Sequence, residues 1–320
     1  MAVVAGIDEA GYGPLLGPLV STVTVFSIPA TLTGKDLWKV LSSSISPGRA
    51  SRSGKLCVAD SKKLFSRAGG LARLERTALT FLHLLGRPTA GLPQLLSALR
   101  TDCARQMNDY PWYIDQSINI PLAVDPMDLA TCLNALRLDT QRNNISFLGV
   151  GCQTLLVGRY NDLVNKTRNK AAVLLGLTGR FLSELVQRYA SEELVIYVDK
   201  QGGRMRYRSL LQQCFPNWDL RILREDPQAS SYQMNKGQLA WQVHFEAAAE
   251  SKHLPVALAS IYAKYLRELF MELLNRYWTK QVPGLRPTAG YYVDGQHFLT
   301  EIGPACKKLG TPMHKLVRSK

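Results

Sequence analysis

The order of apolar and polar positions along the chain predicts strands that alternate with helices. Residues 2–8 are a short apolar run that ends in carboxylates, and residues 19–28 are a β-branched run with alternating polar positions. Glycines and prolines are concentrated between them, in residues 11–18. This pattern predicts two adjacent strands joined by a turn-rich connection.

Later segments continue the alternation. Helical periodicity is found in residues 71–85, 125–138, 165–189 and 255–278. Two more apolar runs, residues 194–199 and 219–223, predict buried strands. Early adjacent strands, followed by strands that are reached through helical crossovers, indicate an α/β fold. The tail from Lys307 onward is basic, and we expect it to be loosely ordered.

Composition and charge narrow the class of protein. The 320 residues are 46% hydrophobic and 20% charged, which is typical of a folded protein with one insertion-bearing core or two domains. The 39 Lys and Arg against 25 Asp and Glu give a net charge of +14, which indicates a polyanionic partner. Nucleic acid fits better than a membrane surface, because no basic amphipathic helix accompanies a lipid-facing stripe.

The cysteines and the N-terminus suggest a compartment. Six widely spaced cysteines form no CxxC pair, so we expect reduced, mostly structural thiols. The N-terminal apolar stretch has no basic flank and contains Asp8 and Glu9, so it predicts neither a signal peptide nor a membrane span. We expect a cytoplasmic monomer.

Carboxylates follow two of the predicted strands. Asp8 and Glu9 end the first, and Asp199 ends the run at residues 194–199. Ligands of open α/β folds bind at such strand ends, and oxygen ligands suit Mg²⁺. On a basic protein this suggests phosphodiester hydrolysis by two ions about 3.5–4 Å apart.

Five ordered segments resemble the type 2 ribonuclease H family, which comprises ribonucleases HII and HIII. They are GIDEAGYGPLLGPLV at 6–20, DSKKL at 60–64, VDKQGGR at 198–204, ESK at 250–252 with ASIYAK at 259–264, and YYVDGQH at 291–297. The resemblance covers roughly residues 3–64 and 160–303.

The resemblance implies a ribonuclease H-like mixed sheet flanked by helices, with a C-terminal helical extension and a mostly helical insertion. It implies cleavage of the RNA strand of RNA-DNA hybrids, or at ribonucleotides embedded in duplex DNA, leaving 3′-hydroxyl and 5′-phosphate ends. The four family acids correspond to Asp8, Glu9, Asp199 and Glu250. Asp8 would bridge two divalent cations, Mg²⁺ or Mn²⁺, and the others would hold one ion or the other.

Two positions depart from the family pattern. Glu250 stands where the family has aspartate, which moves the carboxylate out by one methylene. Tyr12 replaces an arginine that in the family helps to sense the ribose 2′-hydroxyl, although Gly11 and Gly13 still allow close backbone approach. A catalytically weak nucleic-acid-binding protein, or a nuclease for other junctions, therefore remains an alternative.

Further residues are candidates for substrate contact, each with a structural alternative as a solvated, packing or core side chain. The candidates are Gly11, Tyr12, Gly13, Lys62, Lys63, Lys200, Arg204, Arg206, Ser260, Lys264, Tyr291 and Tyr292. The cations that follow Asp199 are candidates for contact with backbone phosphates. Tyr291 or Tyr292 could stack on a sugar. We expect a catalytic core at residues 1–64 and 156–278, an insertion or cap at 65–155, and a C-terminal extension with a basic tail at 279–320.

Overall fold

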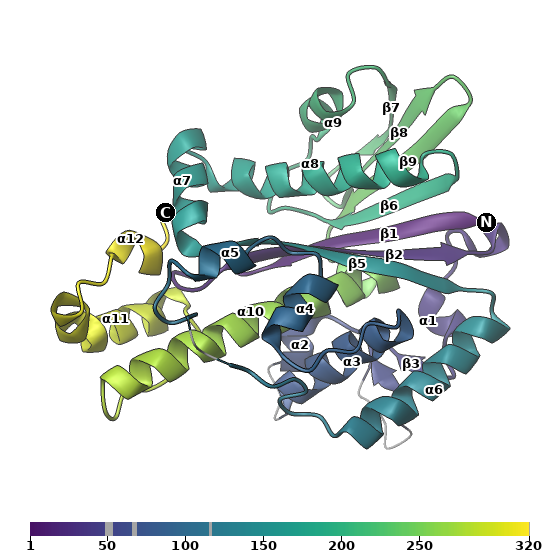
Figure 1. Ribbon diagram of the computed structural model, residues 1–320. Helices are drawn as coiled ribbons and strands as arrows, with labels where there is room; N and C mark the ends of the chain where they lie inside the picture. Colours follow the sequence, from purple (N-terminus) through teal and green to yellow (C-terminus); the bar gives the residue numbers. More distant parts are fainter. Residues whose placement is uncertain (49–53, 66–68, 115–116, 320) are drawn as a thin grey trace.

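The computed structural model describes residues 1–48, 54–65, 69–114 and 117–319, and a twisted mixed sheet runs through its centre (Figure 1). Within these residues the main sheet has seven strands in the order β5-β2-β1-β6-β9-β8-β7. The strands are β1 (Ala2–Ala10), β2 (Leu19–Ile28), β5 (Ser146–Leu155), β6 (Glu193–Asp199), β7 (Asp219–Glu225), β8 (Ala229–Lys236) and β9 (Leu239–Glu246).

Strand direction determines where the chain can place chemical groups. β1 pairs antiparallel with β2, as the sequence predicts, and parallel with β6, which in turn pairs parallel with β9. The three central strands β1, β6 and β9 therefore end at the same edge. A smaller sheet joins β3 (Ile45–Ser46) and β4 (Leu56–Cys57). The mixed sheet with flanking helices confirms the α/β class and the expected architecture.

Helices cover both faces of the sheet (Figure 1). They are α1 (Leu37–Val40), α2 (Ser61–Phe65), α3 (Gly70–Leu84), α4 (Leu92–Ala98), α5 (Ala104–Met107), α6 (Pro126–Arg142), α7 (Val157–Thr167), α8 (Lys170–Tyr189), α9 (Arg208–Cys214), α10 (Leu254–Gln281), α11 (Tyr292–Lys308) and α12 (Met313–Leu316), with 3-10 turns η1 (Ala30–Leu32) and η2 (Ala249–Ser251). None of the helices in the described part of the chain is long and apolar enough to cross a bilayer.

The two faces of the sheet are buried by different helices. Val3, Ala5 and Ile7 of β1 share a buried apolar cluster with α8 residues that include Phe181 and Leu185. On the opposite face α10 lies across β1 and β2. There the buried hydroxyl of Thr22 donates to the Ala259 carbonyl at 2.5 Å, and that of Thr24 donates to the Pro255 carbonyl at 2.7 Å.

Gly6 allows α10 to approach the sheet at backbone distance. A Cβ at this position would lie 2.2 Å from the carbonyl carbon of Pro255 and 2.2 Å from the amide nitrogen of Val256. Neither atom belongs to a side chain that can rotate away, so only glycine fits here. Gly6 thereby sets the depth at which α10 lies on β1.

The helical insertion packs on the other side of α10. Glu75 of α3 is fully buried, and its carboxylate accepts hydrogen bonds from the amides of Leu122 and Ala123 and from the hydroxyl of Tyr265 on α10. Tyr262 of α10 donates to the Ala78 carbonyl at 2.8 Å. These bonds join the insertion to the same core helix that covers the sheet.

Three expectations are corrected. Residues 146–155 are not part of the insertion, because they form β5, which pairs antiparallel with β2 at the edge of the main sheet. The single helix expected at 165–189 is two, α7 and α8, because Arg168 has a positive φ of 49° and Asn169 caps α8.

The C-terminal tail is also not loose. The buried Asn161 side chain donates to the carbonyls of His314 and Val317 and accepts from the amide of Ser319. The Arg318 amide donates to the Leu15 carbonyl at 3.0 Å. These bonds hold the chain end against the loop that connects β1 and β2.

We predict that Gly6→Ala lowers the free energy of unfolding by about 1–3 kcal/mol, the usual cost of overpacking a core. Gly176→Ala is the matched control, because a Cβ there meets no atom within 4 Å and alanine favours a helix by about 1 kcal/mol. Urea denaturation of both variants measures the difference. Equal stability of the two variants would contradict the close approach at Gly6.

Candidate active site

Four acidic residues are brought together where the parallel strands end. Asp8 and Glu9 lie at the end of β1, and Asp199 ends the neighbouring strand β6, in which Val198 is in register with Ile7. Glu250 lies in the 3-10 turn η2, which follows β9 directly. The shared direction of these strands therefore delivers all four carboxylates to one edge of the sheet.

Hydrogen bonds fix two of these carboxylates. Asp8 is 6% exposed, and its Oδ1 accepts from the Glu9 amide at 2.6 Å. The hydroxyl of Ser260, on α10, also hydrogen-bonds Asp8 and lies 2.8 Å from the Ser61 hydroxyl. Asp199 Oδ1 accepts from the amide of Ala249 at 2.9 Å. Asp8 and Asp199 are thus held by the structure around them.

Burial and mutual repulsion make Asp8, Glu9 and Asp199 unusually weak acids. Burial raises the pKa of Asp8 well above its ordinary value, and the charges of Glu9 and Asp199 add to that increase. Burial raises the pKa of Glu9 to about 7, and Asp199 and Glu250 contribute. Burial likewise raises the pKa of Asp199 to about 7, with the adjoining Glu250 as the next cause. The cluster carries more negative charge than its surroundings compensate.

The donor set fits a divalent cation. Glu250 Oε2 is buried and has no hydrogen-bond partner among the described residues, and the four acids offer the oxygen ligands that Mg²⁺ and Mn²⁺ prefer. The described residues contain no group of three or more His, Cys, Asp or Glu already gathered around one point. The carboxylates therefore share an electrostatic field without forming a closed ligand cage.

Lys62 faces this cluster from α2. Burial lowers the pKa of Lys62, but the carboxylates of Asp8, Asp60, Glu250 and Asp199 raise it by more, so the net shift is upward. Lys63, its neighbour, points toward Asp60 instead, with Nζ 3.9 Å from Oδ2. The charge of Lys62 in turn lowers the pKa of Glu9 and Asp199 against the larger upward effect of burial, so this lysine acts on the acidic site.

The loop of residues 11–18 between β1 and β2, here called the glycine-rich loop, lies next to the carboxylates. Gly11 has a φ of +86°, and a Cβ there would lie 2.5 Å from the Pro18 carbonyl oxygen. The Tyr12 ring lies 5.3 Å from the Lys170 ammonium, and Gly13 has open space around its Cα. The loop therefore needs glycine at position 11 and keeps room beside position 13.

Two tyrosines of the C-terminal extension approach the same loop. Tyr291 and Tyr292 are each about half exposed, at 50% and 55%. The Arg267 guanidinium lies 5.8 Å from the Tyr291 ring centroid, and Tyr292 lines a recess together with Tyr12.

Several predicted substrate contacts have partners within the protein. Lys200 donates to the carbonyls of Asp226 and Pro227 at 2.8 and 2.9 Å. Lys264 is 8% exposed and pairs with Glu268 at 2.6 Å. Both lysines thus have partners within the protein, and their contact with phosphate stays a prediction.

Arg204 and Arg206 act electrostatically on different groups. Arg204 acts electrostatically on Tyr12 and Tyr207, lowering the pKa of both against the larger upward effect of burial. Arg206 contributes to lowering the pKa of Glu225, which the hydrogen bond from Arg208 lowers most. The charge of Arg204 therefore reaches the glycine-rich loop.

Sequence reasoning missed three residues of this region: Lys170, Arg267 and Arg318. Arg267 is 1% exposed and donates to the Ala289 carbonyl at 2.9 Å and to the Leu16 carbonyl at 3.4 Å. Lys170 begins a helix that appeared continuous with its predecessor, and Arg318 belonged to an apparently loose tail. The positions of these three side chains depend on tertiary contacts that no local sequence motif predicts.

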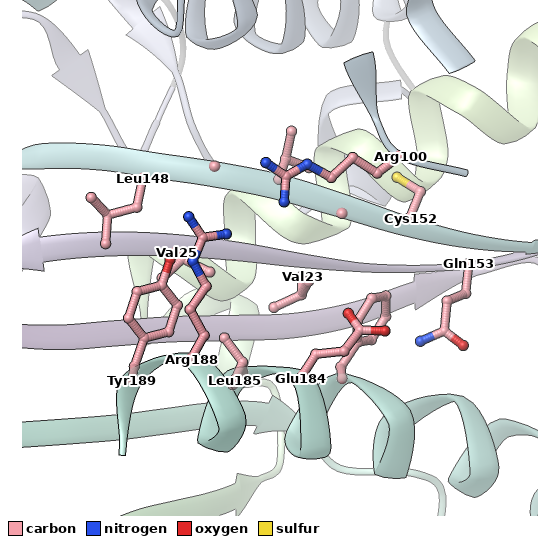
Figure 2. A pocket seen from close by; sticks show the side chains of 14 residues that line it. Val23, Val25, Arg100, Leu148, Cys152, Gln153, Glu184, Leu185, Arg188 and Tyr189 are labelled. Atoms are coloured by element: carbon pink, nitrogen blue, oxygen red, sulfur yellow. The ribbon is translucent and has the colours of Figure 1, made fainter. Parts of the chain in front are cut away.

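A cavity on the face of the sheet that α8 covers is lined by none of the predicted site residues. Arg100, Glu184 and Arg188 lie around this cavity, between β5, β2 and α8 (Figure 2). The volume of the cavity is about 140 Å³. Glycines 149 and 151 of β5 leave part of this space empty.

The site makes stability depend on pH in the absence of metal. Glu9 and Asp199 have folded-state pKa values of about 7, above ordinary values of 4.5 and 3.8. The folded chain therefore binds protons more tightly than the unfolded chain, and the free energy of unfolding falls as pH rises from about 4 to 7.

We predict that Asp199→Asn stabilises the metal-free protein at pH 8 by about 1–2 kcal/mol, because the coupled cluster loses one charge while Oδ1 remains an acceptor. The gain should vanish near pH 4. Thermal and urea unfolding in EDTA measure it, and Asp219→Asn, at an exposed position in β7, is the control. Destabilisation by Asp199→Asn at both pH values would contradict the charge excess.

The C-terminal part of the chain, with two of the four acids, matches a known protein family. Residues 185–298 match the family model described as ribonuclease HII. This segment contains Asp199 and Glu250 and extends from the end of α8 into α11. No curated protein sequence matches the chain significantly.

Solved structures are similar at low sequence identity. A variant of Bst-RNase HIII has a TM-score of 0.46 and 17% identity, over 99% of this chain and 66% of that one. Ribonuclease H2 from Pyrococcus horikoshii OT3 has a TM-score of 0.41 and 17% identity, over 99% and 92%. Ribonuclease HII from Archaeoglobus fulgidus, in its PCNA complex, has a TM-score of 0.41 and 16% identity, over 99% and 94%.

The chain thus spans just under two thirds of the length of Bst-RNase HIII and most of the other two chains. The family-model match contains two of the four acids that the strands bring to one edge, and GIDEAGYG supplies the other two. Residues 185–298 of this chain are therefore similar to ribonuclease HII, and the segment that carries Asp8 and Glu9 lies outside that match.

Proposed function

We propose that the chain is a metal-dependent endoribonuclease of the ribonuclease H type. It would hydrolyse the RNA strand of RNA-DNA hybrids, or incise at ribonucleotides embedded in duplex DNA, and leave 3′-hydroxyl and 5′-phosphate ends. The observation that carries the proposal is the set of four carboxylates gathered at the ends of β1, β6 and β9 beside a glycine-rich loop. The net charge of +14 supports a nucleic-acid substrate.

Asp8, Glu9, Asp199 and Glu250 would hold two divalent cations, Mg²⁺ or Mn²⁺. When bound, such cations lower the pKa of a water molecule and stabilise charge on the phosphate oxygens. The Glu9 amide and the Ser260 hydroxyl orient the Asp8 carboxylate, and the Ala249 amide orients Asp199. These bonds keep both acids in place before substrate arrives, which is what efficient catalysis requires of its ligands.

Lys62 and the glycine-rich loop would bind the nucleic acid. The Lys62 ammonium stays protonated near neutral pH, because the surrounding carboxylates raise its pKa. It would contact a phosphate oxygen next to the cleaved bond. The open space at Gly13 would admit a sugar to the loop backbone, and Tyr12, Tyr291 or Tyr292 would stack on it.

The two departures from the family pattern are compatible with this proposal. Glu250 follows Ala248, whose φ of +54° turns the chain between β9 and α10, and its longer side chain lies against Asp199. Tyr12 brings no charge, but Arg204 acts on its ring and Lys170 lies over it. Cations from other segments therefore reach the position where the family arginine is missing.

The test is cleavage of end-labelled duplexes in Mg²⁺ and separately in Mn²⁺, the ion found with Bst-RNase HIII. The substrates are an RNA-DNA hybrid, a DNA duplex with one ribonucleotide, and an all-DNA duplex. We predict metal-dependent cutting of the first two only. Asp8→Asn should lower the rate more than about 100-fold, because outer partners of metal ligands alone are worth about 10–100-fold.

Asp219→Asn serves as the control with the same change of charge, and it should cut at the wild-type rate. If the wild type binds the duplexes with strong salt dependence and cuts none of them in either metal, the nuclease proposal is wrong for these substrates. The alternative of a nucleic-acid-binding protein on the same fold would then apply. Comparable cutting of the all-DNA duplex would instead indicate a nuclease for other junctions.

A further inference from the structure

The C-terminal end of the chain inserts an arginine beneath the glycine-rich loop. Arg318 is 5% exposed, and its Nε donates to the Gly17 carbonyl at 2.8 Å. Its Nη1 donates to the carbonyl of Gly11. Two sides of the guanidinium are thus occupied by neutral backbone oxygens.

The guanidinium of Arg318 lies 4.8 Å from the Tyr160 ring centroid, and its third nitrogen has no hydrogen-bond partner within the described residues. Arg318 Nη2 is buried there without a hydrogen-bond partner, and none of their carboxylates forms an ion pair with Arg318. Burial and the nearby Arg267 lower the pKa of Arg318 to about 9, so the group is still charged at neutral pH. A buried cation without an anionic partner is costly, and an anion beside it would offset that cost.

A recess next to Arg318 has room for such an anion. Its volume is about 70 Å³, several times the roughly 10–15 Å³ that one water molecule requires. The described residues that line it include Tyr12, Gly13, Tyr160, Lys170, Tyr292 and Arg318, and none of those that line it is an Asp or Glu. The lining thus combines two cations with tyrosine side chains.

The recess is close to the acidic cluster without being part of it. Tyr12 lines the recess, and the charge of Glu9 contributes to raising the pKa of Tyr12 after burial and Tyr160. The carboxylates would hold cations, whereas the recess offers positive charge. A nucleic-acid backbone that passes the cluster could therefore place a neighbouring phosphate in the recess.

We propose that this recess is a phosphate subsite, in which Lys170 and Arg318 hold a backbone phosphate of the bound duplex away from the cleaved bond. This inference rests on the proposed function for the identity of the ligand. The shared chemistry is a phosphate group, and inorganic phosphate is the simplest probe of it.

The test measures duplex binding by fluorescence anisotropy in EDTA, where cleavage is prevented, over a series of KCl concentrations. Lys170→Gln removes an exposed cation of the recess, and Lys166→Gln removes an exposed cation of α7 that does not line it. We expect Lys170→Gln to weaken binding several-fold and to reduce the slope of log K against log[salt] by about 1. Lys166→Gln should change neither.

Arg318→Lys tests the second cation without deleting its charge. Lysine cannot keep both bonds to the Gly11 and Gly17 carbonyls, so the melting temperature of this variant should fall. At a temperature where the variant is fully folded, it should bind the duplex more weakly than wild type, because lysine lacks the planar set of donors. Inorganic phosphate at constant ionic strength should raise the melting temperature of the wild type, and should raise that of Lys170→Gln less.

Equal effects of Lys170→Gln and Lys166→Gln on duplex binding would overturn the subsite while leaving the proposed nuclease intact. Absence of duplex binding by the wild type would contradict the proposed function instead. In that case the effect of inorganic phosphate on the melting temperature tests the recess alone. An increase that is smaller in Lys170→Gln than in the wild type supports an anion site in the recess. An equal increase in both proteins, or none, overturns it.

Discussion

Backbone contact between β1 and α10 at Gly6 is the constraint on which the rest of the structure depends. With no side chain at this position, α10 lies directly on the sheet. The same helix brings Ser260 to Asp8, supplies Tyr265 to the buried Glu75 of the insertion, and places Arg267 under the glycine-rich loop. A helix held further from the sheet would loosen all three connections together. Sheet, insertion and loop are therefore positioned by one packing distance.

The site itself is built against electrostatic repulsion. The parallel strands β1 and β6, and the turn after β9, place Asp8, Asp199 and Glu250 at one edge of the sheet. Burial raises the pKa of Asp8, Glu9 and Asp199, and the charges of Glu9, Asp199 and Glu250 each raise the pKa of at least one neighbouring carboxyl group further. The repulsion among these like charges therefore lowers the free energy of unfolding. Beneath the glycine-rich loop the excess charge is positive, because Arg318 is buried among carbonyl oxygens. A phosphodiester backbone with bound cations, as proposed for the substrate, would complement the charge of both regions.

Much of the site could be predicted from the sequence because its signals are local. A strand that ends in carboxylates is visible in residues 2–9, and Asp199 follows another apolar run, so both were placed at strand ends correctly. β5 was missed because Gly149 and Gly151 weaken its strand pattern. The internal partners of Lys200 and Lys264, and the return of Arg318 to the loop, depend on long-range contacts. Charge can be counted in a sequence, but its pairing is determined by the fold.

The measurement that tests the central claim most directly is calorimetric titration of Mn²⁺ into the wild type, Asp8→Asn and Asp219→Asn. The carboxylate cluster predicts that the wild type and Asp219→Asn bind Mn²⁺ with similar affinity and that Asp8→Asn loses most of this binding. Because metal replaces protons on carboxyl groups with raised pKa values, binding should also release protons near pH 7. Equal Mn²⁺ binding by all three proteins, or none by the wild type, would contradict a cation site at the ends of β1, β6 and β9.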